Sequence, residues 1–231
     1  MTESKGFLKV NKGFPVILRE VYKDSPQKRF GKYNLYFWKV IAYLFHSYLT
    51  GRIDFSKCPY NAYDKFGIKV AVPIHRIIDE PDKDKCYSFM KFVNKNWGKH
   101  YIYVYKKRSY FIFFVKFTLF SLIRFVSSNE RGFVKLPFRD LEKVENIYDF
   151  ICVYYRNSLC KKYDEIAFSR AIKDWKFLLD RKSHKTRDRF IDNLAKSALK
   201  FNFKFFVTDD SNIVYLRDYK WRKRFERKGA L

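Results

Sequence analysis

The spacing of apolar residues predicts that the first part of the chain alternates between helices and strands. Over residues 33–50 the apolar positions recur about every 3.6 residues, which predicts a helix. Residues 68–72 alternate in polarity and predict a strand, and residues 73–78 can form a short helix. Helical spacing returns after the Asp- and Pro-containing break and continues up to Gly98, so we expect another helix there.

The apolar period then changes from the helical value to two. Residues 101–105 and 110–117 predict two strands joined by a basic turn, so this segment should form a β-hairpin. Thr118 can cap a further helix that ends at residues 127–129.

The second half of the chain repeats this order of elements, although no residue-level repeat is visible. We expect a strand at 133–137, a helix around 147–155, a short helix capped by Ser169, a third helix from about Thr186, and a hairpin over 203–207 and 213–216. Helix, helix, turn, helix and hairpin is the order of a winged-helix module. The predicted fold class is therefore α+β with two tandem winged-helix domains, each a helix-turn-helix plus a β-hairpin. They span residues 30–135 and 136–217, between a basic N-terminal arm (1–29) and a basic C-terminal tail (218–231).

Charge indicates the kind of partner. The 231 residues include 49 Lys and Arg against 24 Asp and Glu, a formal net charge of +25, and 21% of them are aromatic. Such a chain suits a polyanion, whose condensed counterions are released on binding. Duplex DNA, an RNA scaffold, an anionic membrane surface and acidic proteins are all polyanions. Apolar residues make up 47% of the chain, enough to build a core, so disorder is not expected.

Other features favour a cytoplasmic protein without a membrane span. The apolar stretch at 110–126 is shorter than the ~20 residues a bilayer requires and contains Lys116 and Arg124. The four cysteines form no paired motif, and the N-terminus lacks a hydrophobic signal core.

The third helix of the second domain carries the strongest candidate for base recognition. Its polar face presents an Arg, an Asn and two Lys at helical spacing, with further basic residues at its start: Lys185, Arg187, Arg189, Asn193, Lys196 and Lys200. Arg can pair with guanine and Asn with adenine, while Lys usually contacts phosphate. The alternative is an ordinary solvated helix face.

Three further basic groups are candidate DNA contacts. The equivalent helix of the first domain offers Lys91, Asn94 and Lys95, the hairpin turn offers Lys106, Lys107 and Arg108 as a wing, and the tail offers Arg222, Lys223, Arg224 and Arg227 among aromatic residues. Their alternatives are a solvated helix, an exposed turn and a disordered solubilising tail.

Catalysis has little support in the sequence. The four histidines form no metal-binding pattern, and no phosphate-cradling glycine loop occurs. The adjacent carboxylates Asp164-Glu165 and Asp209-Asp210 could bind a metal in a nuclease, but both pairs are expected in turns. We therefore predict no enzymatic activity, no cofactor and no metal.

The second domain resembles the C-terminal winged helix of plasmid replication initiator (Rep) proteins. The resemblance lies in the strand ending in Leu136-Pro137, the Tyr-rich helix at 147–155, the segment 166–169 and the basic helix at 189–200. It implies binding to origin repeats by both winged helices, duplex opening, recruitment of host replication proteins, a monomer–dimer switch through the first domain and no intrinsic catalysis. Two alternatives remain open: an RNA-binding subunit of a ribonucleoprotein complex, and a metal-dependent nuclease.

Overall fold

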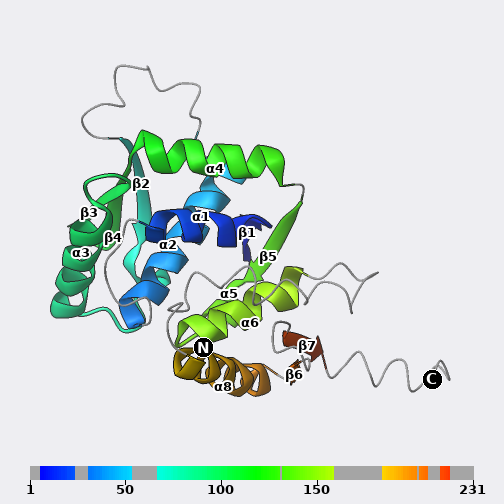
Figure 1. The fold of residues 1–231 in the computed structure, drawn as a ribbon. Coiled ribbons are helices and arrows are strands. Elements are labelled where there is room, and N and C mark those ends of the chain that lie inside the picture. Colours follow the sequence, from blue (N-terminus) through cyan, green and yellow to red (C-terminus); the bar gives the residue numbers. More distant parts are fainter. Residues whose placement is uncertain are drawn as a thin grey trace. The chain divides into compact units, whose positions relative to one another are not determined.

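The chain divides into two compact units. The computed structural model describes residues 6–23, 31–53, 67–130, 132–158, 184–201, 203–207 and 214–218. Unit 1 spans residues 1–142 and unit 2 spans residues 143–231 (Figure 1). Both contain helices and small antiparallel sheets, so the predicted α+β class is confirmed.

Unit 1 contains most of the described elements. In chain order they are β1 (Phe7–Asn11), α1 (Phe14–Lys23), α2 (Lys32–Leu49), β2 (Ile68–Pro73), the 3-10 helix η3 (Ile74–Arg76), α3 (Lys83–Trp97), β3 (Ile102–Lys107), β4 (Tyr110–Val115), α4 (Phe117–Asn129), β5 (Phe133–Pro137) and α5 (Phe138–Leu141). The helices and the hairpin predicted for residues 33–126 are present, with ends within a few residues of those expected. Helix α4 begins two residues earlier than predicted, with Lys116 rather than Thr118 at the N-cap position.

Helix α2 forms the centre of unit 1. Its pattern predicts one apolar stripe, yet nearly every residue from Asn34 to Phe45 is buried, because neighbours surround the helix. The ring of Phe37 stacks on Trp97 of α3 with centroids 3.7 Å apart. The indole of Trp38 donates to the Tyr22 hydroxyl, which in turn donates to Asn34. Trp38 and Asn34 thus find partners within the core, whereas the hydroxyl of Tyr36, also on α2, is buried without a hydrogen-bond partner among the described residues.

A three-stranded antiparallel sheet packs beside α3. Its strand order is β2-β4-β3, so the hairpin β3–β4 is extended by the earlier strand β2 (Figure 1). On one face the apolar side chains of all three strands are buried, and Phe111 there contacts Phe89 of α3. The hairpin loop consists of Arg108 and Ser109, with Arg108 in the left-handed region at φ 54°.

The N-terminal segment corrects the predicted basic arm. Residues 7–23 form β1 and α1 and contribute to the core, with Leu8 and Val10 fully buried. Strand β1 pairs with β5 in a separate two-stranded sheet, in which Leu8 lies opposite Leu136. Apolar alternation in β1 and a helical apolar stripe in α1 account for the burial.

The same pairing corrects the boundary between the two domains. Division after residue 135 would separate β5 from its partner β1, whereas the compact units meet after Glu142. Strand β5 and helix α5 therefore belong to unit 1.

A short residue-level repeat is present after all. Strand β2 leads through Pro73 into η3, and strand β5 leads through Pro137 into α5, with the shared pattern Val-x-apolar-Pro-apolar-x-x-apolar. The two prolines have nearly the same backbone geometry, with φ of −59° and −61° and ψ of 134° and 137°. Proline fixes φ near −65°, which suits the residue before a helical turn.

The described residues of unit 2 form two helices and a pair of antiparallel strands. Helices α6 (Ile147–Ser158) and α8 (His184–Lys200) pack together, and β6 (Phe203–Val207) pairs with β7 (Val214–Asp218). These elements match the prediction, with α8 starting two residues before Thr186. The short helix predicted at Ser169 lies outside the described residues.

Within the part of the chain that the structure describes, no helix has both the length and the apolar character that a bilayer crossing requires. The apolar stretch at 110–126 is divided between strand β4 and helix α4.

Candidate nucleic-acid interface

Helix α3 presents a row of exposed side chains opposite its buried face. Lys83, Tyr87, Lys91 and Lys95 follow one another at intervals of four residues, and all four are exposed. The opposite face packs Cys86, Phe89, Val93 and Trp97 into unit 1. A cap at Asp82, whose carboxylate accepts from the Lys85 amide at 2.6 Å, fixes where the helix begins. The exposed row can therefore meet a flat or grooved polyanion.

The hairpin tip adds a second basic group. Lys106, Lys107 and Arg108 are all exposed, which both a wing and an ordinary turn would predict. Burial raises the pKa of the Cys86 thiol on α3, and the charge of Lys106 at the hairpin tip opposes that rise. No carboxylate of a described residue forms an ion pair with these cations or with Lys91 and Lys95, so they are available to a polyanion.

The side chain of Asn94, predicted to read a base, is hydrogen-bonded to the backbone of the hairpin. Its side-chain amide donates to the Val104 carbonyl at 2.9 Å, and its oxygen accepts from the Val104 amide at 2.8 Å. Val104 lies in β3, which is an edge strand of the sheet, so the Asn94 side chain satisfies backbone groups that lack a neighbouring strand. The residue fastens α3 to the hairpin.

Helix α8 retains only part of the predicted recognition surface. Arg189 and Lys196 are exposed, while Asn193 is half-buried and hydrogen-bonds the side chain of Tyr148. Burial raises the pKa of that tyrosine, and the Asn193 bond and the charge of Arg189 partly oppose the rise. Asn193 therefore helps to join α8 to α6. The side chains of Lys185 and Arg187 lie outside the described residues.

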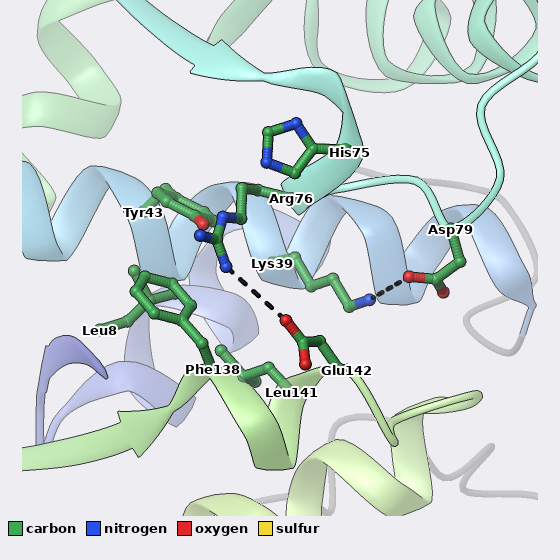
Figure 2. A pocket seen from close by; sticks show the side chains of 9 residues that line it. All are labelled: Leu8, Lys39, Tyr43, His75, Arg76, Asp79, Phe138, Leu141 and Glu142. Carbon is green, nitrogen blue, oxygen red and sulfur yellow. Dashed lines mark hydrogen bonds and ion pairs between the residues drawn. The ribbon is translucent and has the colours of Figure 1, made fainter. Parts of the chain in front are cut away.

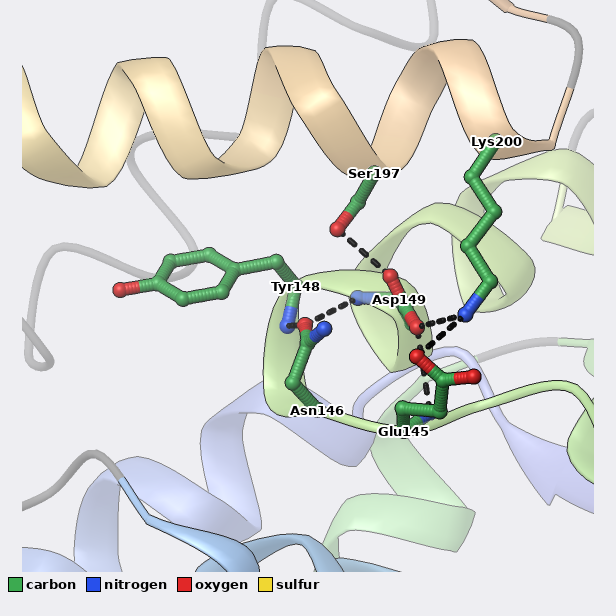
Figure 3. A network of polar contacts seen from close by, with 6 residues as sticks. All are labelled: Glu145, Asn146, Tyr148, Asp149, Ser197 and Lys200. Carbon is green, nitrogen blue, oxygen red and sulfur yellow. Dashed lines mark hydrogen bonds and ion pairs between the residues drawn. The ribbon is translucent and has the colours of Figure 1, made fainter.

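Lys200 is exposed, but its ammonium pairs with carboxylates of unit 2. Its ammonium lies 2.9 Å from the Asp149 carboxylate and 3.0 Å from that of Glu145 (Figure 3). Burial disfavours the charge of Lys200, but the hydrogen bonds to Asp149 and Glu145 outweigh burial and raise its pKa. The predicted phosphate contact is therefore a structural cation, because its side chain already neutralises a buried carboxylate.

Asp149 is the centre of this network and was not singled out by the sequence reasoning. It is 1% exposed and accepts hydrogen bonds from the Ser197 hydroxyl at 2.6 Å, from Lys200 and from the Glu145 amide at 3.1 Å. Asn146 caps the start of α6 by accepting from two backbone amides, as Figure 3 shows. The spacing Asn146-x-x-Asp149 resembles a capping box and would have been a usable signal.

The cavity in Figure 2 lies within unit 1 and holds two separate ion pairs. It has a volume of about 120 Å³ and lies between α2, η3 and α5. The ammonium of Lys39 lies 3.3 Å from the carboxylate of Asp79, and the guanidinium of Arg76 lies 3.8 Å from the carboxylate of Glu142. The same guanidinium lies over the Phe138 ring, 4.3 Å from its centroid. Burial lowers the pKa of Lys39, and Asp79 counteracts that effect. The charged side chains of the cavity are thus paired with one another. The Arg76–Glu142 pair links the two short helices that follow Pro73 and Pro137, η3 and α5.

Several predicted site residues lie outside the described residues. These are the basic tail residues Arg222, Lys223, Arg224 and Arg227 and the carboxylate pairs Asp164-Glu165 and Asp209-Asp210.

Comparison with known proteins adds no relative to this picture. No protein-family model, no curated protein and no solved structure matches the chain.

Proposed function

We propose that the protein binds duplex DNA through unit 1, with α3 in the major groove and the hairpin tip on the neighbouring backbone. The observation that carries this proposal is the set of exposed cations formed by Lys91 and Lys95 on α3 and by the tip, none of which forms an ion pair with a carboxylate of a described residue. They stand on an order of helix, strand, short helix, helix and hairpin, which is that of a winged-helix domain. Because Asn94 is occupied, we assign α3 mainly to backbone contacts, with Lys91 and Lys95 as the principal ones.

The backbone at Arg108 supports a role for the hairpin tip. A non-glycine residue in the left-handed region costs roughly 1–2 kcal/mol, and glycine would avoid most of that cost. An arginine retained at such a position is expected where its side chain contributes to binding. A guanidinium at the tip of the hairpin can form two hydrogen bonds to a phosphate.

Unit 2 offers a second candidate contact to DNA. Helix α8 followed by the β6–β7 hairpin has the order of the last elements of a winged helix, and Arg189 and Lys196 are exposed on α8. Two such modules in one chain suit a repeated target sequence. We therefore retain the finer proposal that the protein initiates replication by binding direct repeats at a plasmid-type origin and recruiting host replication proteins.

Filter binding at two salt concentrations tests the duplex assignment. The ligands are a duplex with the direct repeats of the encoding replicon, a scrambled duplex and a structured RNA. Lys91→Ala with Lys95→Ala should weaken duplex binding about tenfold or more and lower the salt dependence by about one ion per lysine. The control, Arg124→Ala with Lys143→Ala, removes the same charge from exposed positions on α4 and in unit 2.

The outcomes separate the candidate functions. Equal losses from the two double variants would mean that bulk charge, not α3, governs binding. Tighter binding to RNA than to every duplex would replace the proposal with the RNA-binding alternative. Equal affinity for the repeat and scrambled duplexes would remove the initiator assignment and leave general DNA binding.

A further inference from the structure

The three-stranded sheet of unit 1 has an open face opposite the one that packs on α3. Its three rows across β2, β4 and β3 are Lys69, Phe114 and Tyr103; Ala71, Ile112 and Tyr105; and Pro73, Tyr110 and Lys107. None of these nine residues is buried, and Tyr103 and Tyr110 are 46% and 45% exposed. We call this set the aromatic face.

The rings of the aromatic face lie close together. Phe114 on the central strand is 5.5 Å from Tyr105, with the two rings nearly parallel at 28°, and 6.3 Å from Tyr103. The ammonium of Lys69 lies 5.4 Å from the Phe114 ring. Alternate residues along a strand are about 6.7 Å apart, so successive rows offer rings at a spacing that splayed bases can match.

We infer that the aromatic face binds a single strand of DNA, with its bases on the tyrosine rings and its phosphates at Lys69 and Lys107. Stacking on aromatic rings combined with a cationic border is the usual chemistry of single-strand recognition. This site lies on the opposite side of the sheet from α3, and Lys107 at the hairpin tip is the one residue that it shares with the proposed duplex contact. The choice of DNA over RNA rests on the proposed function, whereas the single-strand site itself does not.

Charge distinguishes a nucleic acid from a second copy of the chain as the occupant. Strands β2, β3 and β4 contain three lysines and no Asp or Glu. If two copies met through this face, the lysines of one copy would approach a face that has no carboxylate in its strands. Like charges brought together in this way disfavour association, whereas phosphates would be attracted.

Fluorescence anisotropy with a labelled oligodeoxyuridine of about 12 nucleotides tests the inference. Tyr103→Ala with Tyr110→Ala should weaken single-strand binding by about tenfold per tyrosine, while affinity for a duplex of the same length changes less than about twofold. Replacement of both tyrosines by Phe keeps the rings and should preserve binding. Phe125→Ala, at a 65% exposed ring on α4, is the control and should have no effect.

Each other result overturns the inference. Single-strand affinity unchanged in the Ala variant, or no single-strand binding by the native chain, would exclude the site. A homodimer seen by light scattering and lost in the Ala variant without loss of single-strand affinity would assign the face to a second copy. Tighter binding of the matching oligouridine would transfer the site to RNA. Failure of the duplex proposal is detected separately, by an absence of effect of the Lys91 and Lys95 substitutions on duplex affinity.

Discussion

Helices α3 and α8 have the same predicted role but use their polar residues differently. On α3 the lysines remain exposed and the asparagine is bound to the edge strand β3. On α8 both the asparagine and the last lysine are bound to side chains at the start of α6. At each helix, the amide expected to read a base instead holds the helix in place.

The comparison shows why a helical row of polar residues is an incomplete guide to recognition. Helical spacing tells which residues share a face, but not what the fold places against that face. A neighbouring backbone edge or a buried carboxylate can occupy an amide or ammonium as well as a nucleic acid can. Exposure together with a lack of internal partners is the stronger criterion, and α3 meets it better than α8.

The largest expected effect is the loss of stability of unit 2 when the carboxylate of Asp149, which holds α8 to α6, is removed. Asp149→Ala removes the acceptor of three hydrogen bonds and should lower the free energy of unfolding of unit 2 by about 2–4 kcal/mol. Amide hydrogen exchange in α6 and α8 measures this loss, and exchange in α3 should not change. Asp192→Ala, which removes an exposed carboxylate from α8, is the control. Equal exchange in the two variants would mean that the network does not support α8.

Asn94→Ala tests the corresponding support of α3. Loss of the two bonds to Val104 should destabilise unit 1 by about 1–2 kcal/mol, measured by urea unfolding. Asn94→Asp retains an acceptor for the Val104 amide but no donor, so it should fall between Ala and the native residue. If Asn94→Ala instead weakened binding to one DNA sequence alone and left stability unchanged, the residue would be a base reader after all.

Arg108→Gly tests whether the hairpin tip contributes to DNA binding and not to stability, in contrast to Asn94 and Asp149. Relief of the left-handed strain should leave the stability of unit 1 unchanged or raise it by up to about 1 kcal/mol, because the greater chain entropy of glycine offsets part of the gain. Duplex affinity should nevertheless fall about threefold to tenfold. Arg108→Lys keeps both charge and strain and serves as the control. A parallel fall in stability and affinity would contradict a direct contact.

Mild acid should lower the stability of unit 1 by protonating His46, which accepts a hydrogen bond from the backbone of β1. Nδ1 of His46 accepts from the Lys9 amide at 3.0 Å, and burial lowers the histidine pKa, with Arg52 and Lys9 adding to the effect. The unfolded chain then binds the proton more readily, so stability should fall as pH drops below the ordinary value of 6.5. Thermal unfolding between about pH 7 and 5 measures this smallest effect, and His46→Gln should remove it.

Much of the fold was predictable because its signals are local. Helical spacing identified α2, α3, α6 and α8, and the change to period two identified the hairpin β3–β4. The basic arm predicted before residue 30 is wrong for residues 7–23, because the alternation of Leu8 and Val10 and the helical apolar stripe of α1 place this segment in the core. The pairing of β1 with β5 joins distant segments, and no local pattern reports such a partner.

The candidate site was predictable to a smaller extent. The exposure of Lys91, Lys95 and the hairpin cations followed from amphipathic spacing and turn position. The commitment of Asn94 to Val104 depends on the edge position of β3, which requires the strand order. The pairing of Lys200 likewise depends on Asp149, a buried residue of another helix, α6. Contacts made across elements are decided by tertiary packing and cannot be read from one helix.

The pairing of β1 with β5 also affects how unit 1 is made. Strand β1 is synthesised first, yet its partner leaves the ribosome only after residue 137, on the order of ten seconds later. During that interval β1 lacks its native neighbour, and an unpaired apolar strand is a site for aggregation. Closing so long a loop also slows folding. Unit 1 should therefore depend on chaperones during synthesis more than its final packing suggests, and a chain that stops before β5 should not fold.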